Sequence, residues 1–278
     1  MHELNCQVSD GLWEALRAHM RETGEPLRHV VASAIAQHLD VSHRTLFQVS
    51  TSSALVEGVY QGAVTVGVLR RHGNLGLGTF EMLDGEMVVV DGEFHQVKSD
   101  GSVHPVADDV LTPFAAVTEF EPDIEAEMEA CPDLTALTSQ FDAMRGSPNV
   151  FYALRVDGVF DFVRTRAMCK TEEGTPLAQA ALTQPEFDFE HIAGTLVGFW
   201  SPQYAKAFNV PGYHLHFLSA DRRHGGHLLQ CAGKGLRLRL QTEANVQVAL
   251  PETEDFLKAD LTRDPSVALK FAENDQKR

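Results

Sequence analysis

A long series of short strand-like segments begins at Thr45, and it constrains the fold more than any other feature of the 278-residue chain. Apolar and polar residues alternate within these segments, while Gly and Asp-Gly turn signals separate them. Only a few stretches between them are helical in pattern. We therefore expect an α+β fold with two sheet-containing lobes of mixed and antiparallel strands, at residues 43–148 and 149–278.

Three stretches of this region lead to specific predictions. Residues 46–60 begin strand-like and become helical in pattern. Residues 121–148 are acidic, helix-prone and free of β runs, so we expect a helix between two sheet regions. Residues 149–163 are apolar on either side of Val156-Asp157-Gly158, which predicts two strands around a turn.

The first 42 residues have a different pattern. Polar and apolar residues alternate over 3–8 as in a strand, Ser9 can cap a first helix, and Pro26 can open a second. This order resembles a ribbon-helix-helix unit, which pairs with a second copy because it cannot bury a core alone. Six acidic residues against three arginines within 1–40 suit phosphate binding poorly. We therefore expect a homodimerisation module and not a DNA reader; the alternative is a helical hairpin packed on its own catalytic domain.

The overall charge limits the partners of the protein. Lys and Arg total 23 and Asp and Glu total 39, which gives a formal net charge of -16. Because this average field repels a polyanion, nucleic acid is not an expected partner without a local basic patch. A small anionic substrate meets the same field and needs a local cation at its site.

The cysteines and the lack of long apolar runs indicate the compartment. Cys6, Cys131, Cys169 and Cys231 are widely spaced and form no C-x-x-C pair, so we expect buried thiols in a reducing compartment. No apolar run approaches the ~20 residues that a membrane-spanning helix needs. The chain also starts without a basic segment followed by an apolar one. We therefore expect a cytoplasmic protein with no membrane partner.

Three histidines of one predicted hairpin give the strongest chemical signal. Residues i and i+2 of a strand point to the same side, so His214 and His216 project together. The segment 219–226 is rich in turn residues, which predicts a returning strand that begins at His227. Three neutral imidazoles that converge in this way bind zinc tetrahedrally and leave one position open. Spacing alone leaves open an ordinary surface pair, and His224 as the third ligand.

The same hairpin resembles the metal motif of acetolactate decarboxylases, through NVPGYHLHF and the later Gly-Gly-His. The resemblance extends from about Thr45 to the C-terminus, and several separated motifs in register are far more specific than one H-x-H. The other similar stretches are FQVSTSSALVEGVYQG (47–62), HGNLGLGTFEMLDGEMVVVDGEFHQVKSDG (72–101), FYALRVDGVFDFVRTR (151–166), TQPEF (183–187), GTLVGFWSPQYA (194–205) and LPETEDF (250–256).

The resemblance implies a set of site residues. The family's zinc ligands are the H-x-H pair and the histidine after Gly-Gly, which places His224 in a loop. Its motifs further contain a threonine, a glutamate, an arginine and a late carboxylate. The matching residues here are His214, His216 and His227 for Zn²⁺, and Thr79, Glu86, Arg166 and Glu273 for the reaction.

The family's activity, decarboxylation of 2-acetolactate to acetoin and carbon dioxide, implies what these residues do. The substrate is a 2-hydroxy-3-keto acid, so the electrons left by carbon dioxide can move into the ketone as an enediolate. Zinc chelated by the ketone and hydroxyl oxygens would stabilise that charge before protonation. Arg166 would orient the carboxylate, Glu86 would relay the proton, and Thr79 would hydrogen-bond the site.

Two other functions are compatible with the histidine pattern. A cupin-like iron oxygenase also uses H-x-H and a later histidine, usually with a carboxylate a few residues after the pair, where this chain has only Asp221. A non-catalytic binding protein stabilised by its metal needs the histidines alone.

Overall fold

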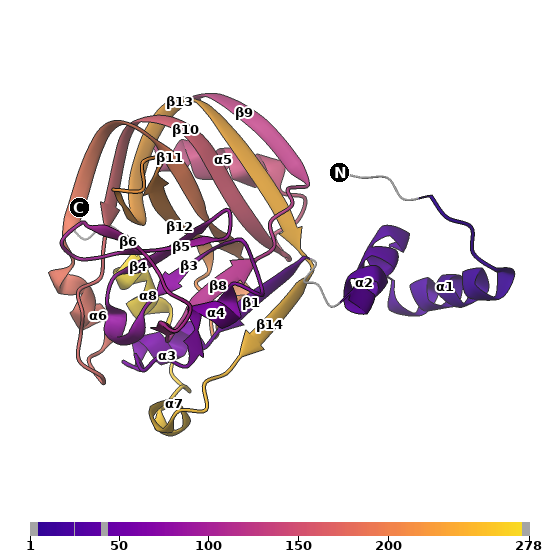
Figure 1. The fold of residues 1–278 in the computed structure, drawn as a ribbon, viewed down its shortest axis with the longest axis horizontal. Helices are drawn as coiled ribbons and strands as arrows, with labels where there is room; N and C mark the ends of the chain where they lie inside the picture. The colour runs from indigo at the N-terminus through magenta and orange to yellow at the C-terminus, as the bar shows by residue number, and fades with distance from the viewer. Residues whose placement is uncertain (1–4, 25, 40–43, 274–278) are drawn as a thin grey trace. The chain divides into compact units, whose positions relative to one another are not determined.

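The computed structural model describes residues 5–24, 26–39 and 44–273. The chain divides into two compact units, one that ends at His43 and one that begins at Arg44 (Figure 1). No helix in these described ranges is both long enough and apolar enough to cross a membrane.

The first unit contains two helices, α1 (Asp10–Thr23) and α2 (Leu27–Leu39). Ser9 caps α1 by accepting a hydrogen bond from the Leu12 amide, and Gly24 ends it in the left-handed conformation. Both predicted helices are therefore present. The predicted strand is not: residues 5–8 are irregular, and residues 3 and 4 lie outside the described residues. A strand of that kind pairs with its copy in a second chain, and a single chain offers no such partner.

The second unit is α+β, as predicted, and its larger sheet has seven strands. β1 runs parallel to β14, whereas all the neighbouring pairs from β1 to β6 are antiparallel. Asp91 and Gly92, both with positive φ, form the tight turn between β4 and β5. The strands in order are β14 (Asn245–Ala249), β1 (Thr45–Val49), β8 (Ala115–Thr118), β3 (Leu75–Thr79), β4 (Glu86–Val90), β5 (Glu93–Val97) and β6 (Val103–Pro105).

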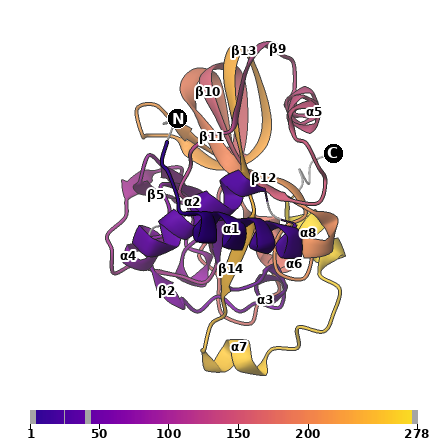
Figure 2. The same ribbon diagram turned by 90° about the vertical axis from the view of Figure 1, so that its right-hand side faces the viewer.

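The second sheet has five strands, and β9, β10, β11 and β13 arch over the first sheet in Figures 1 and 2. β10 pairs with both β11 and β13, and β12 also lies between β11 and β13, so four strands close on themselves. The strands are β10 (Phe151–Arg166), β11 (Glu186–Ser201), β12 (Gly212–Ser219), β13 (Gly225–Glu243) and β9 (Ile124–Cys131).

One apolar layer joins the two sheets. Leu77 and Val88 from the larger sheet pack against Val197 and Leu218 from the smaller one, and all four are buried. Each sheet also contains a strand from the other half of the chain, since β9 joins the five-stranded sheet and β14 the seven-stranded one. The division into lobes at residue 148 stays a prediction.

Short elements complete the unit. β2 and β7 form a separate two-stranded antiparallel sheet, and α8 packs beside α6 and α3. The remaining elements are α3 (Ser52–Val56), β2 (Val64–Thr65), α4 (Val66–Leu69), η1 (Glu81–Leu83), β7 (Leu111–Thr112), α5 (Leu134–Met144), α6 (Leu177–Ala180), η2 (Ala181–Thr183), η3 (Gln203–Ala205), α7 (Glu254–Lys258) and α8 (Ser266–Glu273).

The prediction of one acidic helix within 121–148 was half wrong. The helix α5 is present, but it follows the strand β9. The acidic residues of β9 face arginines of β13: Glu125 stands opposite Arg239, and Arg237 donates to Glu125 at 2.6 Å. The partner strand, distant in sequence, therefore overrides the local preference for helix.

The prediction of two strands in 149–163 was also wrong, because β10 is continuous. Its register with β13 shifts between Asp157 and Phe160, so the Asp-Gly forms a bulge and not a turn. The Asp157 carboxylate accepts hydrogen bonds from Arg155 at 3.1 Å and from Thr195 at 2.9 Å. These contacts hold the bulge within the sheet.

Candidate metal centre and active site

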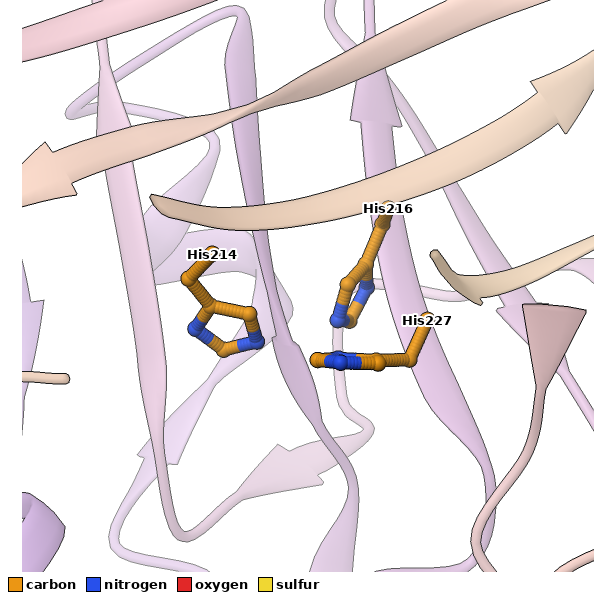
Figure 3. Close-up of side chains that lie close together, drawn as sticks. All are labelled: His214, His216 and His227. Atoms are coloured by element: carbon orange, nitrogen blue, oxygen red, sulfur yellow. The ribbon is translucent and has the colours of Figure 1, made fainter. Parts of the chain in front are cut away.

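Three histidines meet at the β12–β13 hairpin. His214 and His216 lie on the same face of β12, and His216 stands directly opposite His227 on β13. One ring nitrogen of each residue lies within 4.8 Å of the other two. Their ring centroids are 5.1–5.3 Å apart, and Figure 3 shows the rings gathered around a common space. These three side chains could hold a metal ion.

The protonation state of His216 fits metal binding. Its Nδ1 lies 2.8 Å from the Met87 carbonyl oxygen, which only accepts, so Nδ1 carries the proton. Nε2 is then left with its lone pair, and it is buried with no hydrogen-bond partner among the described residues. Burial lowers the pKa of all three rings, that of His214 to about 3, which keeps them neutral. Neutral imidazoles whose ring nitrogens share one space form a donor set for a metal ion.

An arginine and a glutamate border the triad. Arg166, at the end of β10, stands opposite His227 in the sheet and is buried. Glu86 begins β4, accepts from the Met168 amide at 3.1 Å, and places Oε2 3.6 Å from His216 Nε2. Burial raises the pKa of Glu86 to about 8, with Glu273 adding to the rise and Arg166 opposing it. A carboxyl group of this kind holds a proton at neutral pH.

Glu273, the carboxylate that the sequence predicted near the C-terminus, lies at the end of α8, the last helix. Glu273 Oε2 lies 3.4 Å from His227 Nε2 and 3.8 Å from His214 Nε2. Burial raises the pKa of Glu273 to about 7, against the opposing charge of Arg166. Thr79 stands opposite Glu86 in the β3–β4 pair and donates from its hydroxyl to the Gly85 carbonyl at 2.7 Å.

Apart from His216, all these groups line one small cavity. Its volume is about 60 Å³, and a single water needs ~10–15 Å³ on the same measure, so the space suits a small ligand. Its polar lining is Thr79, Glu86, Arg166, Gln184, His214, His227 and Glu273. A neighbouring pocket of about 510 Å³ shares His227 and Glu273 with it. The structure therefore brings together the predicted residues; Gln184, within the quoted TQPEF stretch, was not predicted.

Two side chains that the sequence offered as alternative metal ligands, His224 and Asp221, are not part of this cluster. His224 is exposed, and its ring contacts that of Phe189 in a tilted arrangement, with ring centroids 4.9 Å apart. Asp221, the carboxylate that an oxygenase site would use, is exposed in the hairpin turn and accepts a hydrogen bond from Ser219 at 2.6 Å. The carboxylates near the triad come instead from β4 and α8.

A three-histidine cluster with an adjoining buried arginine and two carboxyl groups of raised pKa is characteristic of a metal-dependent enzyme. The family model for alpha-acetolactate decarboxylase matches residues 46–263. The chain belongs to the alpha-acetolactate decarboxylase family.

Individual relatives agree with this assignment. An alpha-acetolactate decarboxylase from Methylococcus capsulatus is 43% identical over 230 residues, which cover 82% of this chain and 88% of the relative. One from Bacillus licheniformis is 38% identical, over 86% of this chain and 95% of the relative. The crystal structure of the Bacillus subtilis strain 168 enzyme superposes with a TM-score of 0.81 at 36% identity, covering 83% of this chain and all of that one.

Proposed function

We propose that this protein catalyses zinc-dependent decarboxylation of 2-acetolactate to acetoin and carbon dioxide. The observation that carries the proposal is that Arg166 and Glu86 line one small cavity together with His214 and His227, two members of the three-histidine cluster. Membership of the alpha-acetolactate decarboxylase family supplies the substrate and the product.

The triad suits zinc because three imidazole nitrogens leave one coordination position open for a substrate. A bound zinc ion would supply Lewis-acid stabilisation of the negative charge that builds up on the substrate's ketone and hydroxyl oxygens. The hydrogen bond from His216 to the Met87 carbonyl fixes that ring's tautomer and orientation before any ion arrives.

Arg166 would hold the substrate carboxylate. Its planar guanidinium can donate two parallel hydrogen bonds to a carboxylate, and it lies in the cavity wall beside His227. It also supplies the local cation that an anionic substrate needs in a protein with a net charge of -16.

Glu86 would deliver the proton that replaces carbon dioxide. Breaking the carbon–carbon bond leaves an electron pair on the substrate, and a proton must then reach one face of that carbon. Glu86 lines the cavity, and its raised pKa lets it carry the proton at neutral pH. Glu273, with a pKa raised to about 7, can exchange protons from the side of α8.

Incubation of the purified protein with 2-acetolactate under inert gas tests the proposal. We expect acetoin and carbon dioxide in equal amounts, together with protein-bound zinc by elemental analysis. Bound iron with product formation only in oxygen would indicate an oxygenase instead. Substrate binding without any turnover would indicate a metal-stabilised binding protein.

A further inference from the structure

A glutamine side chain in the cavity wall has no internal role. Both amide atoms of Gln184, Oε1 and Nε2, are buried and have no hydrogen-bond partner among the residues that the structure describes. Leaving such groups unsatisfied costs ~1–3 kcal/mol each. Gln184 also lines the same small cavity as Arg166 and His214. Its amide is therefore available to a molecule that occupies the cavity.

The backbone holds Gln184 firmly in this position. The residue that follows is Pro185, which restricts Gln184 to extended backbone, and its φ of -67° and ψ of 126° agree. The Ala167 amide donates to the Pro185 carbonyl at 3.3 Å. The Cys169 thiol contacts the Thr183 carbonyl at 3.4 Å. Two links to the chain just after Arg166 thus fix the segment beside that arginine.

We propose that Gln184 is a substrate-positioning residue that recognises the 2-hydroxy acid group, an inference that rests on the proposed function. A carboxamide presents one donor and one acceptor side by side. A 2-hydroxy acid presents the complement, a hydroxyl donor beside a carboxylate acceptor. Nε2 donates to the carboxylate that Arg166 also holds, and Oε1 accepts from the 2-hydroxyl. A neutral amide thereby selects an acid that carries this hydroxyl.

Gln184→Met tests the assignment, because methionine has a similar volume and neither hydrogen-bonding group. We expect kcat/KM for 2-acetolactate to fall about tenfold or more, from two lost hydrogen bonds of ~1 kcal/mol each. The bound metal stays unchanged, and the Tm stays equal or rises, because an unsatisfied buried amide is removed. Gln184→Glu lowers kcat/KM further, because its carboxylate repels the substrate's. The matched control is Gln179→Met, an exposed glutamine on α6 outside the cavity.

The binding of two stable acids distinguishes recognition of the hydroxyl by Gln184 from a role of Gln184 in packing alone. 2,2-Dimethylbutanoate differs from 2-hydroxy-2-methylbutanoate only in a methyl group that replaces the hydroxyl, and thermal shift measures how well each acid binds the zinc-loaded protein. In the parent the hydroxy acid binds more tightly than the dimethyl acid. Gln184→Met should reduce the ratio of the two binding affinities. A packing role would weaken both acids equally and lower the Tm.

A Gln184→Met variant with parental kcat/KM and an unchanged ratio between the two acids would overturn the inference while leaving the proposed function intact. If the parent itself makes no acetoin, the proposed function fails. The binding ratio of the two acids still decides the role of Gln184 in that case, because that measurement needs no turnover.

Discussion

Glu86 combines two properties that a surface glutamate lacks: it is buried, and its Oε2 lies 3.6 Å from a histidine nitrogen of the triad. Glu86→Gln keeps the shape and removes the titrating proton. We expect the variant to retain its metal and to lose ~10²–10⁴-fold in kcat. Acetoin formation and elemental analysis measure the two effects. Glu93→Gln, on the exposed side of the neighbouring strand, is the control. Parental turnover by Glu86→Gln would assign the proton to another group.

A second buried glutamate, Glu243, affects stability. Burial raises its pKa to about 7, although Gln241 donates to its Oε1 at 2.9 Å. The folded protein therefore binds this proton more tightly than the unfolded chain does, so its contribution to stability is lost as pH rises from about 4.5 to about 7. We expect Glu243→Gln to be more stable than the parent at pH 8, by up to ~3 kcal/mol.

Urea unfolding of Glu243→Gln and of the parent at pH 5 and at pH 8 checks this sign. The advantage of the variant should shrink at pH 5, where the parent's carboxyl group is already neutral. An advantage that is the same at both pH values would show that the Glu243 proton is not bound differently in the folded and unfolded states.

Among the elements, the β12–β13 hairpin could be predicted because its signals are local. H-x-H on a strand places both rings on one face, and the turn residues before His227 set the return. β9 could not be predicted, because its acidic residues form a strand only against the arginines of β13. The position of the Gln184 amide could not be predicted either, because it depends on the contact between the Ala167 amide and the Pro185 carbonyl, which are distant in the sequence. The spacing of residues within one hairpin thus predicts the metal ligands. The groups around them depend on contacts between segments that are distant in the sequence.

The helix α8 serves both the fold and the site. Its Leu269 and Ala272 are buried against Leu55 and Val210, while Glu273 faces the triad. Ending the chain before Ser266 should abolish acetoin formation and lower stability by ~2–5 kcal/mol, the range for losing a buried Leu side chain. Glu273→Gln should lower turnover with an unchanged Tm. A truncated protein as active and stable as the parent would exclude α8 from both roles.

At the scale of the whole molecule, the first unit lies outside the range matched by the family model. α1 buries none of its residues within the unit, and Leu12 and Trp13 are 57% and 41% exposed. We propose that a second copy of the chain covers this apolar surface. Deletion of residues 1–42 should then lower the oligomeric mass in light scattering and leave acetoin formation near the parental rate. An unchanged mass would assign assembly to another surface.

We propose that the three histidines hold one zinc ion and that acetoin formation depends on it. Zinc titration into chelator-treated protein, with acetoin measured at each step, tests it most directly. We predict no acetoin without metal, a linear rise to a plateau at a single zinc ion per chain, and no rise in His216→Ala, which lacks a ligand. Full activity in the metal-free protein, or an unchanged titration in His216→Ala, would show that acetoin formation does not depend on zinc held by these histidines.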